Sequence, residues 1–460
     1  MLQKLEKFFK VKEEGSTVKR ELLAGVTSFL ASAFTIITIP NMILGQEYQN
    51  PNLVNAIFIA ACFSAVIGTL LKAFYAKIPF IQAPGMGLGA FFSGTVMPAM
   101  IVLSGNPELS RLEQYQMALG VVLVAGLIFC LLTISGIREK IIGAVPDNIK
   151  AALGPGIGLF ITLLGLRFSG IVVNSPGTFV ALRNFSDWQP AALGAVLSIV
   201  GLLIIVILSM KKIKGAILIG IIFTTLLTYI TGHSNLPDTF SLAMGERFND
   251  FWTLSFLQLD FSFFGTGSIG TIIAFIMAFV FVNMLDALGT IYGISKANGM
   301  VDKNGKVKRL EQGLTADAIG TAVSGFLGSS TVTTVVSSAS GIGEGGRTGL
   351  TSLTASALFL LAIFLAPFIA LIPNVAIAPA LIYVGYLMIS NIKEIDFSDI
   401  TEGFPAFLTV ALMPLSFNIA AGIAFGLISY IVIKIFTGKI KEIKITTVLI
   451  AALFVLQYIF

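Results

Sequence analysis

APGMGLGAFFSGTVMP, residues 83–98, is the stretch that decides the fold. It is apolar enough for a membrane interior, but its four glycines and its early proline disfavour a continuous spanning helix. Non-helical backbone is tolerated at membrane depth only where it is buried in protein or lines a cavity. We therefore expect an extended stretch leading to a half-helix, whose free N–H groups and positive dipole end can point at a ligand. Close helix packing through small residues is the alternative interpretation.

The composition of the whole chain supports a membrane setting. Of its 460 residues, 56% are hydrophobic and 12% are charged, and the mean hydropathy is +0.93. A soluble domain is nearer to about 25% charged, so the sequence predicts an all-α polytopic membrane protein. The first twenty residues are too charged for a cleavable signal sequence. We expect them to form a short amphipathic helix that leads onto the membrane surface.

Fourteen segments of the chain qualify as membrane segments, given that a spanning helix needs about 20 mostly apolar residues. Three of these segments are short or rich in Gly, Ser and Thr, namely 83–98, 329–343 and 403–415. A last stretch, 445–460, is either a short fifteenth span or an interfacial helix. The remaining predicted segments are 21–44, 53–76, 117–135, 149–167, 190–210, 214–232, 266–294, 314–328, 350–372, 376–392 and 417–437.

Basic residues concentrate in alternate loops and so predict the orientation of the chain. The N-terminal tail has six of them, and Lys72 and Lys77 are counted in the same series. The loop 233–262, in contrast, has one Arg and four acids. By the positive-inside rule the N-terminus is cytoplasmic in a multi-pass protein of the cell (cytoplasmic) membrane. The net charge of +5 therefore reflects orientation, and we expect no nucleic-acid partner.

Few residues have the chemistry for catalysis or for metal binding. His233 is the single histidine, and the two cysteines, Cys62 and Cys130, both lie inside apolar runs. We interpret the cysteines as unpaired packing residues, so no disulfide or metal framework is implied. The sequence shows no nucleophile–base pair and no metal-ligand cluster, and it predicts neither an enzyme nor a cofactor.

The fourteen predicted segments divide into two sets of seven. The third segment of each set is short and broken, at 83–98 and 329–343. The stretches 144–160 and 371–387 also match, since each places a Pro-Asx turn before a helix of small residues. Because seven is odd, the second set must enter the membrane with the opposite topology. An inverted repeat with broken segments at matching places is typical of a secondary transporter and points to its site.

FVNMLDALGT, residues 281–290, carries one acid, Asp286, at the end of a long apolar run. An Asp near the centre of a membrane helix costs roughly 2.5–3.5 kcal/mol, so such an acid is a functional hypothesis by default. Asn283, Asp286 and Thr290 share a helix face with two glycines. That small polar face suits a planar ligand whose N–H groups donate to the carboxylate, and desolvation of the carboxylate suits proton coupling. A structural hydrogen bond to a neighbouring helix is the alternative.

Two further features have both a functional and a structural interpretation. Phe91 follows the first glycine-rich stretch, where its ring is able to stack on a flat ligand or to pack in the core or against lipid. In GIGEGGRTGLTS (341–352), Glu344 and Arg347 are three residues apart and so are candidates for an ion pair. We interpret this stretch as a loop that leads into a helix, because its glycines do not form a nucleotide-phosphate loop.

Six stretches in this order carry a resemblance to a known family: APGMGLGAFF (83–92), FVNMLDALGT (281–290), ADAIGTAVSGFLGSSTVTT (316–334), GGRTGLTS (345–352), APALIYVG (378–385) and MPLSFNIAAGIAFGLISY (413–430). Together they resemble the nucleobase:cation symporter-2 (nucleobase-ascorbate transporter) family. The specific resemblance is to its azaguanine-like (AzgA) branch of adenine, guanine and hypoxanthine permeases. It extends from about residue 20 to about residue 440, which is nearly the whole chain.

This resemblance implies a UraA-like fold of 14 transmembrane segments in two inverted 7-segment repeats. It implies a core domain of segments 1–4 and 8–11, and a gate domain of segments 5–7 and 12–14. It also implies proton-coupled uptake of a nucleobase by an elevator-like motion, often in a homodimer. In this sequence the implied parts are the N-terminal tail 1–20, the core 21–135 and 266–372, the gate 136–232 and 373–437, and the C-terminal tail 438–460.

The resemblance also implies where the substrate binds, namely between the broken segments 3 and 10, with contacts from segment 8. Asp286 matches the acid of segment 8 and is the expected residue for proton coupling. Three positions depart from the family pattern: Asn283 stands where an acid is common, Gly89 replaces an Asn, and Ser337 replaces a Glu that is a major substrate ligand. The predicted substrate-binding residues are Asp286, Ser337, Thr290, Asn283, Gly89, Phe91, Ala90 and Ser338.

The presence of Ser337 in place of the family's Glu affects which substrate is expected. Losing this carboxylate removes an acceptor for purine N–H groups, and a site built around such a bond loses affinity when the partner is missing. A purine such as adenine, guanine or hypoxanthine is the first expectation. The alternative is a same-fold transporter of another small heterocycle, or of an organic anion that the half-helix N-termini would attract.

Overall fold

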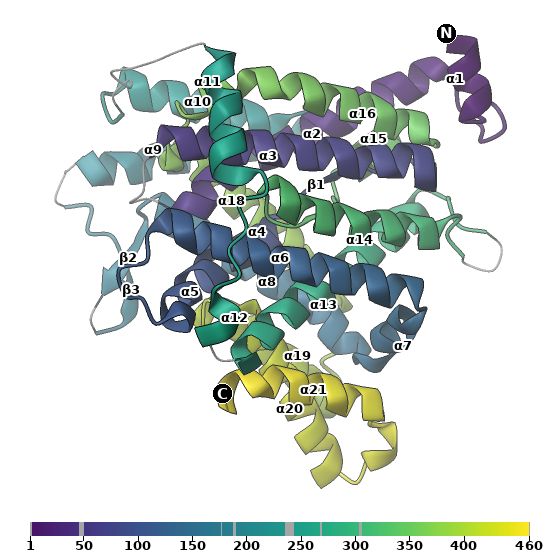
Figure 1. The fold of residues 1–460 in the computed structure, drawn as a ribbon, viewed down its shortest axis with the longest axis vertical. Helices are drawn as coiled ribbons and strands as arrows, with labels where there is room; N and C mark the ends of the chain where they lie inside the picture. Colours follow the sequence, from purple (N-terminus) through teal and green to yellow (C-terminus); the bar gives the residue numbers. More distant parts are fainter. Residues whose placement is uncertain are drawn as a thin grey trace.

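The computed structural model describes residues 2–45, 50–175, 177–186, 190–234, 243–266, 269–302 and 306–459. It is mostly helical, with two small antiparallel sheets of two strands each (Figure 1). In chain order the elements are α1 (Leu2–Phe8), α2 (Val18–Leu44), α3 (Pro51–Leu70), β1 (Gln82–Pro84), α4 (Met86–Phe91), α5 (Met97–Ser104), α6 (Arg111–Ile134), α7 (Ile137–Ala144), α8 (Asp147–Phe168), β2 (Val172–Ser175), β3 (Phe179–Leu182), α9 (Pro190–Met210), α10 (Ala216–Ile230), α11 (Met244–Asp250), α12 (Phe263–Thr266), α13 (Ile269–Ala297), α14 (Leu310–Leu327), β4 (Val332–Thr334), α15 (Ser338–Gly343), α16 (Gly349–Ala362), α17 (Ala366–Ile369), α18 (Asn374–Ile389), α19 (Ile400–Leu415), α20 (Ile419–Phe436) and α21 (Ile445–Ile459).

The helices confirm the predicted multi-pass membrane protein. Within the described residues, ten helices are long and apolar enough to cross a membrane. Each of the fourteen predicted segments has a counterpart among the elements of the structure. One counterpart, α14, is helical without being among the ten, and it carries Asp317 in its middle. That all fourteen segments cross the membrane stays a prediction. Three shorter apolar helices cover Ala216–Ile230, Ile400–Leu415 and Ile445–Val455.

Most helices pack in two groups, and each group mixes helices from both halves of the chain. In the first group α16, α3, α14 and α6 lie side by side in that order, with α2 packed against α3 and α16 (Figure 1). In the second group α8 packs on α18, α19 and α20, and α9 and α10 pack on α18. Helix α13 lies between them, with contacts to α6 and α14 of the first group and to α8 and α20 of the second.

The two broken segments meet in the sheet formed by β1 and β4. The strands are antiparallel, with Gln82 opposite Thr334 and Pro84 opposite Val332. Each strand is followed by a short helix, α4 after β1 and α15 after β4. The predicted combination of a short strand and a half-helix is therefore confirmed in both halves. The first copy continues through a π-helical turn into α5, whereas α15 ends at Gly343.

The N-terminal tail is helical as expected, but its apolar residues pack on protein. Phe9 and Val11 are buried together with Leu350 of α16. The Ser16 hydroxyl donates a hydrogen bond of 2.9 Å to the Gly345 carbonyl. The expected membrane-surface position is therefore wrong for these two side chains, because α16 offers them an apolar partner. At the other end of the chain, α21 packs along α13 and α20.

Candidate functional site

The β1–β4 sheet, where the two broken segments meet, is called the crossing below. It has a polar side that faces α14 and the end of α3. There the Lys72 ammonium lies 2.7 Å from Oδ2 of Asp317, and both side chains are fully buried. Lys72 also donates to the Gly313 carbonyl at 2.7 Å. The Thr334 hydroxyl of β4 lies 2.9 Å from each Asp317 oxygen. A buried ion pair needs such additional hydrogen bonds to offset its desolvation, and here they fasten β4 to two helices.

The sequence interpretation missed this network. The charge pattern assigned Lys72 to a loop, and this assignment is wrong, because Lys72 lies in the π-helical segment Leu71–Ala76 that prolongs α3 into the protein interior. Asp317 lies in the stretch 316–334, which supported the family resemblance, and no role of its own was assigned to it from the sequence. An acid in an apolar segment was the available signal, the same one that drew attention to Asp286.

Asn283 joins the same network from α13. Its amide nitrogen donates to the Thr321 hydroxyl at 2.5 Å. The Thr321 hydroxyl in turn lies 2.9 Å from the Asp317 carbonyl and 3.2 Å from the Val332 carbonyl of β4. Asn283 is fully buried, and its amide oxygen has no hydrogen-bond partner among the described residues. The position where the family commonly has an acid thus carries an amide that links α13 to α14 and, through Thr321, to β4.

Asp286 lies one helical turn beyond Asn283, next to this network. It is partly exposed and forms no ion pair or hydrogen bond within the described part of the chain. Helix α14, which carries Asp317, packs against α13. Since Lys72 neutralises Asp317 directly, Asp286 is the acid whose lone pairs stay available to a ligand.

Open space adjoins Asp286 on its own helix face. Gly289 and Gly293, three and seven residues further on, have no atom within 4 Å of the place where a Cβ would lie. Thr290 lies beside them and is 8% exposed. The face that the sequence predicted to be small and polar therefore carries no bulky side chain at these two exposed glycines.

The two serines predicted at the start of α15 differ in their surroundings. Ser338 is fully buried, and its hydroxyl accepts a hydrogen bond of 3.1 Å from the Ile81 amide next to β1. Ser337 is the N-cap residue of α15, and its side chain makes no capping bond. It is only half-buried and follows Val336, which is 64% exposed. Ser338 therefore joins the two broken segments, while Ser337 lies at the open end of the second.

The predicted residues of α4 are packed among neighbouring helices. Gly89 and Ala90 are buried, and a Cβ on Gly89 would lie 2.6 Å from Ile39 Cδ1 and from Met42 Cε of α2. Space that an Asn side chain would need at Gly89 is thus occupied by these two residues. Phe91 is fully buried with its ring edge-on to that of Phe279 of α13, at a centroid distance of 5.1 Å.

The stretch 341–352 forms the loop into α16, and its charged residues do not pair with each other. Glu344 pairs instead with Lys214 at 2.8 Å. The Arg347 side chain donates to two backbone carbonyls, of Ile342 and Gly346. The start of α16 is capped by a residue that the sequence interpretation passed over: the buried Glu21 carboxylate accepts from the amides of Arg347, Thr348 and Thr351. This loop is therefore structural, as interpreted.

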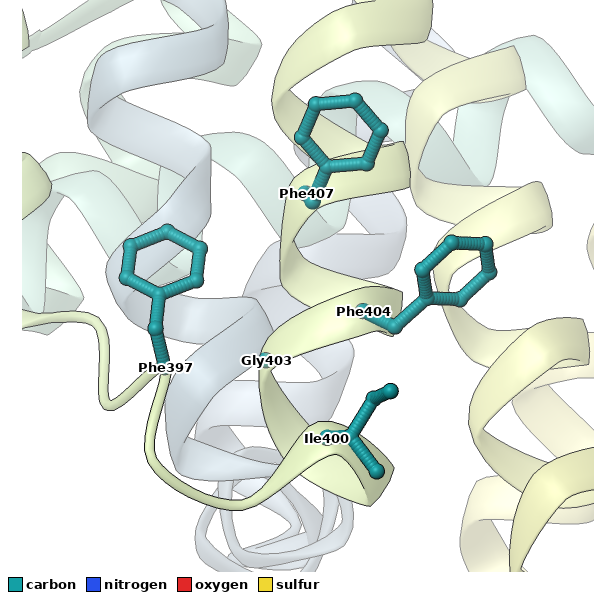
Figure 2. Close-up of a pocket in the computed structure, with 5 residues that line it drawn as sticks. All are labelled: Phe397, Ile400, Gly403, Phe404 and Phe407. Carbon is teal, nitrogen blue, oxygen red and sulfur yellow. The ribbon is translucent and has the colours of Figure 1, made fainter.

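A shallow pocket of about 230 Å³ lies on α19, away from the crossing. Figure 2 shows Ile400, Gly403, Phe404 and Phe407 on one helix, with Phe397 on the chain that precedes it. The four larger side chains are exposed and apolar, which is the usual composition of a lipid-facing surface. None of the predicted site residues lines this pocket.

Two broken segments that pair inside a bundle of apolar helices are the architecture of a membrane transport protein. The model of the "Permease family" matches residues 19–453 of this chain. The chain belongs to this permease family, the nucleobase:cation symporter-2 family that the sequence resembles.

Full-length relatives support the assignment. The chain is 39% identical to a putative permease of Methanocaldococcus jannaschii, over 99% of this chain and 98% of the relative. It is 36% identical to the adenine permease AdeP of Escherichia coli, over 99% and 96%. It is 32% identical to the guanine/hypoxanthine permease PbuO of Bacillus subtilis, over 98% and 99%.

A solved structure supports the fold. The transmembrane domain of the cyanobacterial bicarbonate transporter BicA superposes with a TM-score of 0.63. The match covers 90% of this chain and 96% of that one at 18% identity. The predicted UraA-like architecture is thereby confirmed.

Proposed function

We propose that this protein is a secondary active transporter that takes up a purine nucleobase, such as adenine, guanine or hypoxanthine, together with protons. The observation that carries the proposal is Asp286, an acid without an ion-pair partner among the described residues, which borders open space beside the β1–β4 crossing. The similarity to relatives named adenine and guanine/hypoxanthine permeases supports the substrate class.

In this proposal the ligand binds between Asp286 and the two half-helices. The carboxyl group of Asp286 accepts from a ring N–H group of the base and, when it carries the coupled proton, donates to a neighbouring ring nitrogen. The N-termini of α4 and α15 present backbone N–H groups to the acceptor atoms of the base. Ser337 contributes a hydroxyl at the open end of the second half-helix.

Proton coupling follows from the neighbourhood of Asp286. Its charge and that of Asp317 repel each other, and Lys72 is already engaged with Asp317. A proton on Asp286 removes the repulsion, and the protonated carboxyl donates its O–H and still accepts on its carbonyl oxygen, so a base that offers a ring nitrogen beside an N–H binds the protonated form. In this proposal the proton and the base each favour binding of the other, which is the positive linkage that symport needs.

We assign the elevator-like motion to the two groups of helices. The group that holds the crossing, 21–135 and 266–372, is the moving core, and 136–232 together with 373–437 is the gate. The two parts meet where α4 packs on α8, and there a Cβ on Gly87 would lie 2.3 Å from Ile157. The distribution of basic residues supports a cytoplasmic N-terminus in the cell membrane.

The test is uptake of radiolabelled adenine, guanine and hypoxanthine into proteoliposomes with an imposed proton gradient. Asp286→Asn keeps the shape of the side chain and removes its charge. We expect uptake to fall severely and to lose its dependence on the proton gradient, because the amide keeps a donor and an acceptor but cannot take up or release a proton. Glu108→Gln is the matched control, since Glu108 is an exposed loop acid. Normal uptake by Asp286→Asn, at normal protein levels, would contradict the role of Asp286.

One observation favours a second candidate, a small organic anion. Ser337 stands where the resembled family has a Glu, which lowers the negative charge near the two half-helix N-termini. A thermal-shift screen of the purified protein with nucleobases and small carboxylates separates the candidates. Stabilisation by carboxylates and by none of the nucleobases would favour the anion.

A further inference from the structure

A second cavity, of about 210 Å³, lies at the end of the molecule where the N-terminal tail docks. Its walls are the tail, the chain that leads from α3 into β1, the C-terminal part of α13, the loop before α14 and the loop before α16. Apart from the tail, all of these belong to the part that we assign as the core. The cavity therefore lies apart from the contact between core and gate, and the proposed transport site does not account for it.

Four cations and one acid line this cavity. The acid, Glu14, pairs with Lys308 at 2.5 Å. The other three cations, Lys77, Arg309 and Arg347, have no carboxylate partner among the described residues. Like charges gathered around a hollow repel one another, and an anion placed between them relieves this repulsion.

Two of these cations are held in position by the backbone. Arg347 Nη1 donates to the carbonyls of Ile342 and Gly346, at 2.7 and 2.8 Å. Arg309 Nη1 lies 3.4 Å from the Lys77 carbonyl. A guanidinium has five N–H donors, so each Arg keeps several for a ligand. The paired N–H donors of a guanidinium match the spacing of phosphate oxygens.

Ser295 supplies an independent sign of a ligand. It is fully buried on α13 and lines the cavity, yet its hydroxyl has no hydrogen-bond partner within the described residues. Buried hydroxyls are nearly always hydrogen-bonded, and an unpaired one calls for a partner that the protein alone does not provide. A phosphate oxygen in the cavity would be such a partner.

Apolar side chains also line the cavity and form an apolar wall, with Ile78, Phe80 and Ile291 among them. A bare inorganic ion would leave this wall uncovered. We propose that the cavity binds a phosphate-bearing anion whose remaining part rests on the apolar wall. A soluble nucleotide and the headgroup region of an anionic phospholipid both have this chemistry.

The experiment uses the full-length protein in nanodiscs. The proposed transport site would also bind the adenine of AMP, so loss of phosphate and AMP binding in Arg309→Gln, which leaves Asp286 in place, distinguishes binding in this cavity from binding at the transport site. In phosphatidylcholine discs, inorganic phosphate and AMP are titrated, and binding is followed by ³¹P NMR line broadening and by the melting temperature. A second set of discs contains phosphatidylglycerol. Saturable binding of AMP or phosphate supports a soluble ligand, and stabilisation only by phosphatidylglycerol supports a lipid.

Three variants test whether the cavity itself binds. Arg309→Gln removes a lining charge and Ser295→Ala removes the unpaired hydroxyl. Lys296→Gln is the matched control, since it removes a charge from the same end of α13 but is exposed and does not line the cavity. We expect affinity to fall about tenfold or more in Arg309→Gln, severalfold in Ser295→Ala and little in Lys296→Gln.

Two results would overturn the proposal. Equal weakening by Arg309→Gln and Lys296→Gln would show diffuse charge attraction instead of a site. Absence of binding to phosphate, to AMP and to phosphatidylglycerol would show that the cavity has no such ligand. If Arg309→Gln lowers the melting temperature of the unliganded protein, only Ser295→Ala and Lys296→Gln are compared. Weaker binding in Ser295→Ala than in Lys296→Gln then supports the site, and equal binding overturns it.

Discussion

The two broken segments occupy matching places in the repeat, but the protein holds them by different means. The first, β1 with α4, is held mostly by packing: Ala83 and Leu88 are almost fully buried, and Gly87 lies against Ile157 of α8. Its side-chain hydrogen bonds to α3 are those between the Thr69 hydroxyl and the Gln82 backbone. The second, β4 with α15, is fastened by polar bonds such as that of Thr334 to Asp317. The turn between its strand and its helix is open to the surroundings, as the 64% exposure of Val336 shows.

This difference shows that the two copies share the order of strand and half-helix but contribute different interactions. The first copy contributes mostly packing, and the second contributes polar bonds. The packed copy forms a fixed wall, because a strand and half-helix surrounded by apolar atoms have little room to reorganise. The polar copy places its strand next to the network of Lys72, Asp317 and Asn283, one helical turn from Asp286. We infer that the second copy sets the polarity of the site and the first sets its shape.

The largest predicted effect comes from breaking the polar anchor of the second copy. Lys72→Met removes the ammonium and leaves the Asp317 carboxylate buried with Thr334 as its side-chain donor. Leaving one charge of a buried pair uncompensated costs about 3–5 kcal/mol. We expect a corresponding loss in the free energy of unfolding, measured by chemical denaturation in detergent.

The matched control is Lys150→Met, which breaks an ion pair with an Asp147 side chain that is 98% exposed. Exposed pairs contribute roughly 0–1 kcal/mol, so this variant should be nearly as stable as the native protein. Similar losses in the two variants would show that the second copy does not depend on its buried pair.

A smaller effect is predicted for two neighbouring threonines of β4. Thr334→Val removes a hydroxyl that lies 2.9 Å from both Asp317 oxygens, and a hydrogen bond to a charged group contributes about 1.5–3 kcal/mol. Thr333→Val, on the other face of the strand, removes a buried hydroxyl that has no partner among the described residues. We expect Thr334→Val to lower the melting temperature and Thr333→Val to leave it unchanged or raise it. The reverse order would mean that polar bonds do not anchor the second copy.

Local sequence signals predicted the strand and half-helix of each copy but not the way in which each copy is held. Glycine and proline inside an apolar segment exclude a continuous helix on backbone grounds alone, so 83–98 was identified without knowledge of its partners. The bond between Lys72 and Asp317 joins residues 245 positions apart. No local pattern encodes such a contact, and the charge pattern assigned Lys72 to a loop together with Lys77.

Within the site, the contacts of several residues depend on the exact residue at which a helix begins or ends, which the sequence did not predict. Glu344 and Arg347 have the spacing of a helical ion pair, but α15 ends at Gly343, so they do not share a helix. Ser337 and Ser338 are equivalent in sequence. They differ only because α15 begins at Ser338, which turns that hydroxyl toward the Ile81 amide. Asp286 was identified from the sequence because an acid in a membrane helix is unusual, whichever residues surround it in the fold.

The smallest predicted effect concerns the packing of the first copy on α8. Gly87→Ala places a Cβ 2.3 Å from Ile157 Cγ2, closer than van der Waals contact allows, and such overpacking costs about 1–3 kcal/mol. The control, Gly94→Ala, places its Cβ at an ordinary 3.6 Å from the Phe160 ring. Because Gly87 contacts the part that we assign as the gate, we expect Gly87→Ala to slow nucleobase uptake in proteoliposomes in addition to lowering the melting temperature. Uptake as fast as in Gly94→Ala would mean that α4 and α8 need not stay in close contact during transport, and the first copy would then not be the fixed wall of the site.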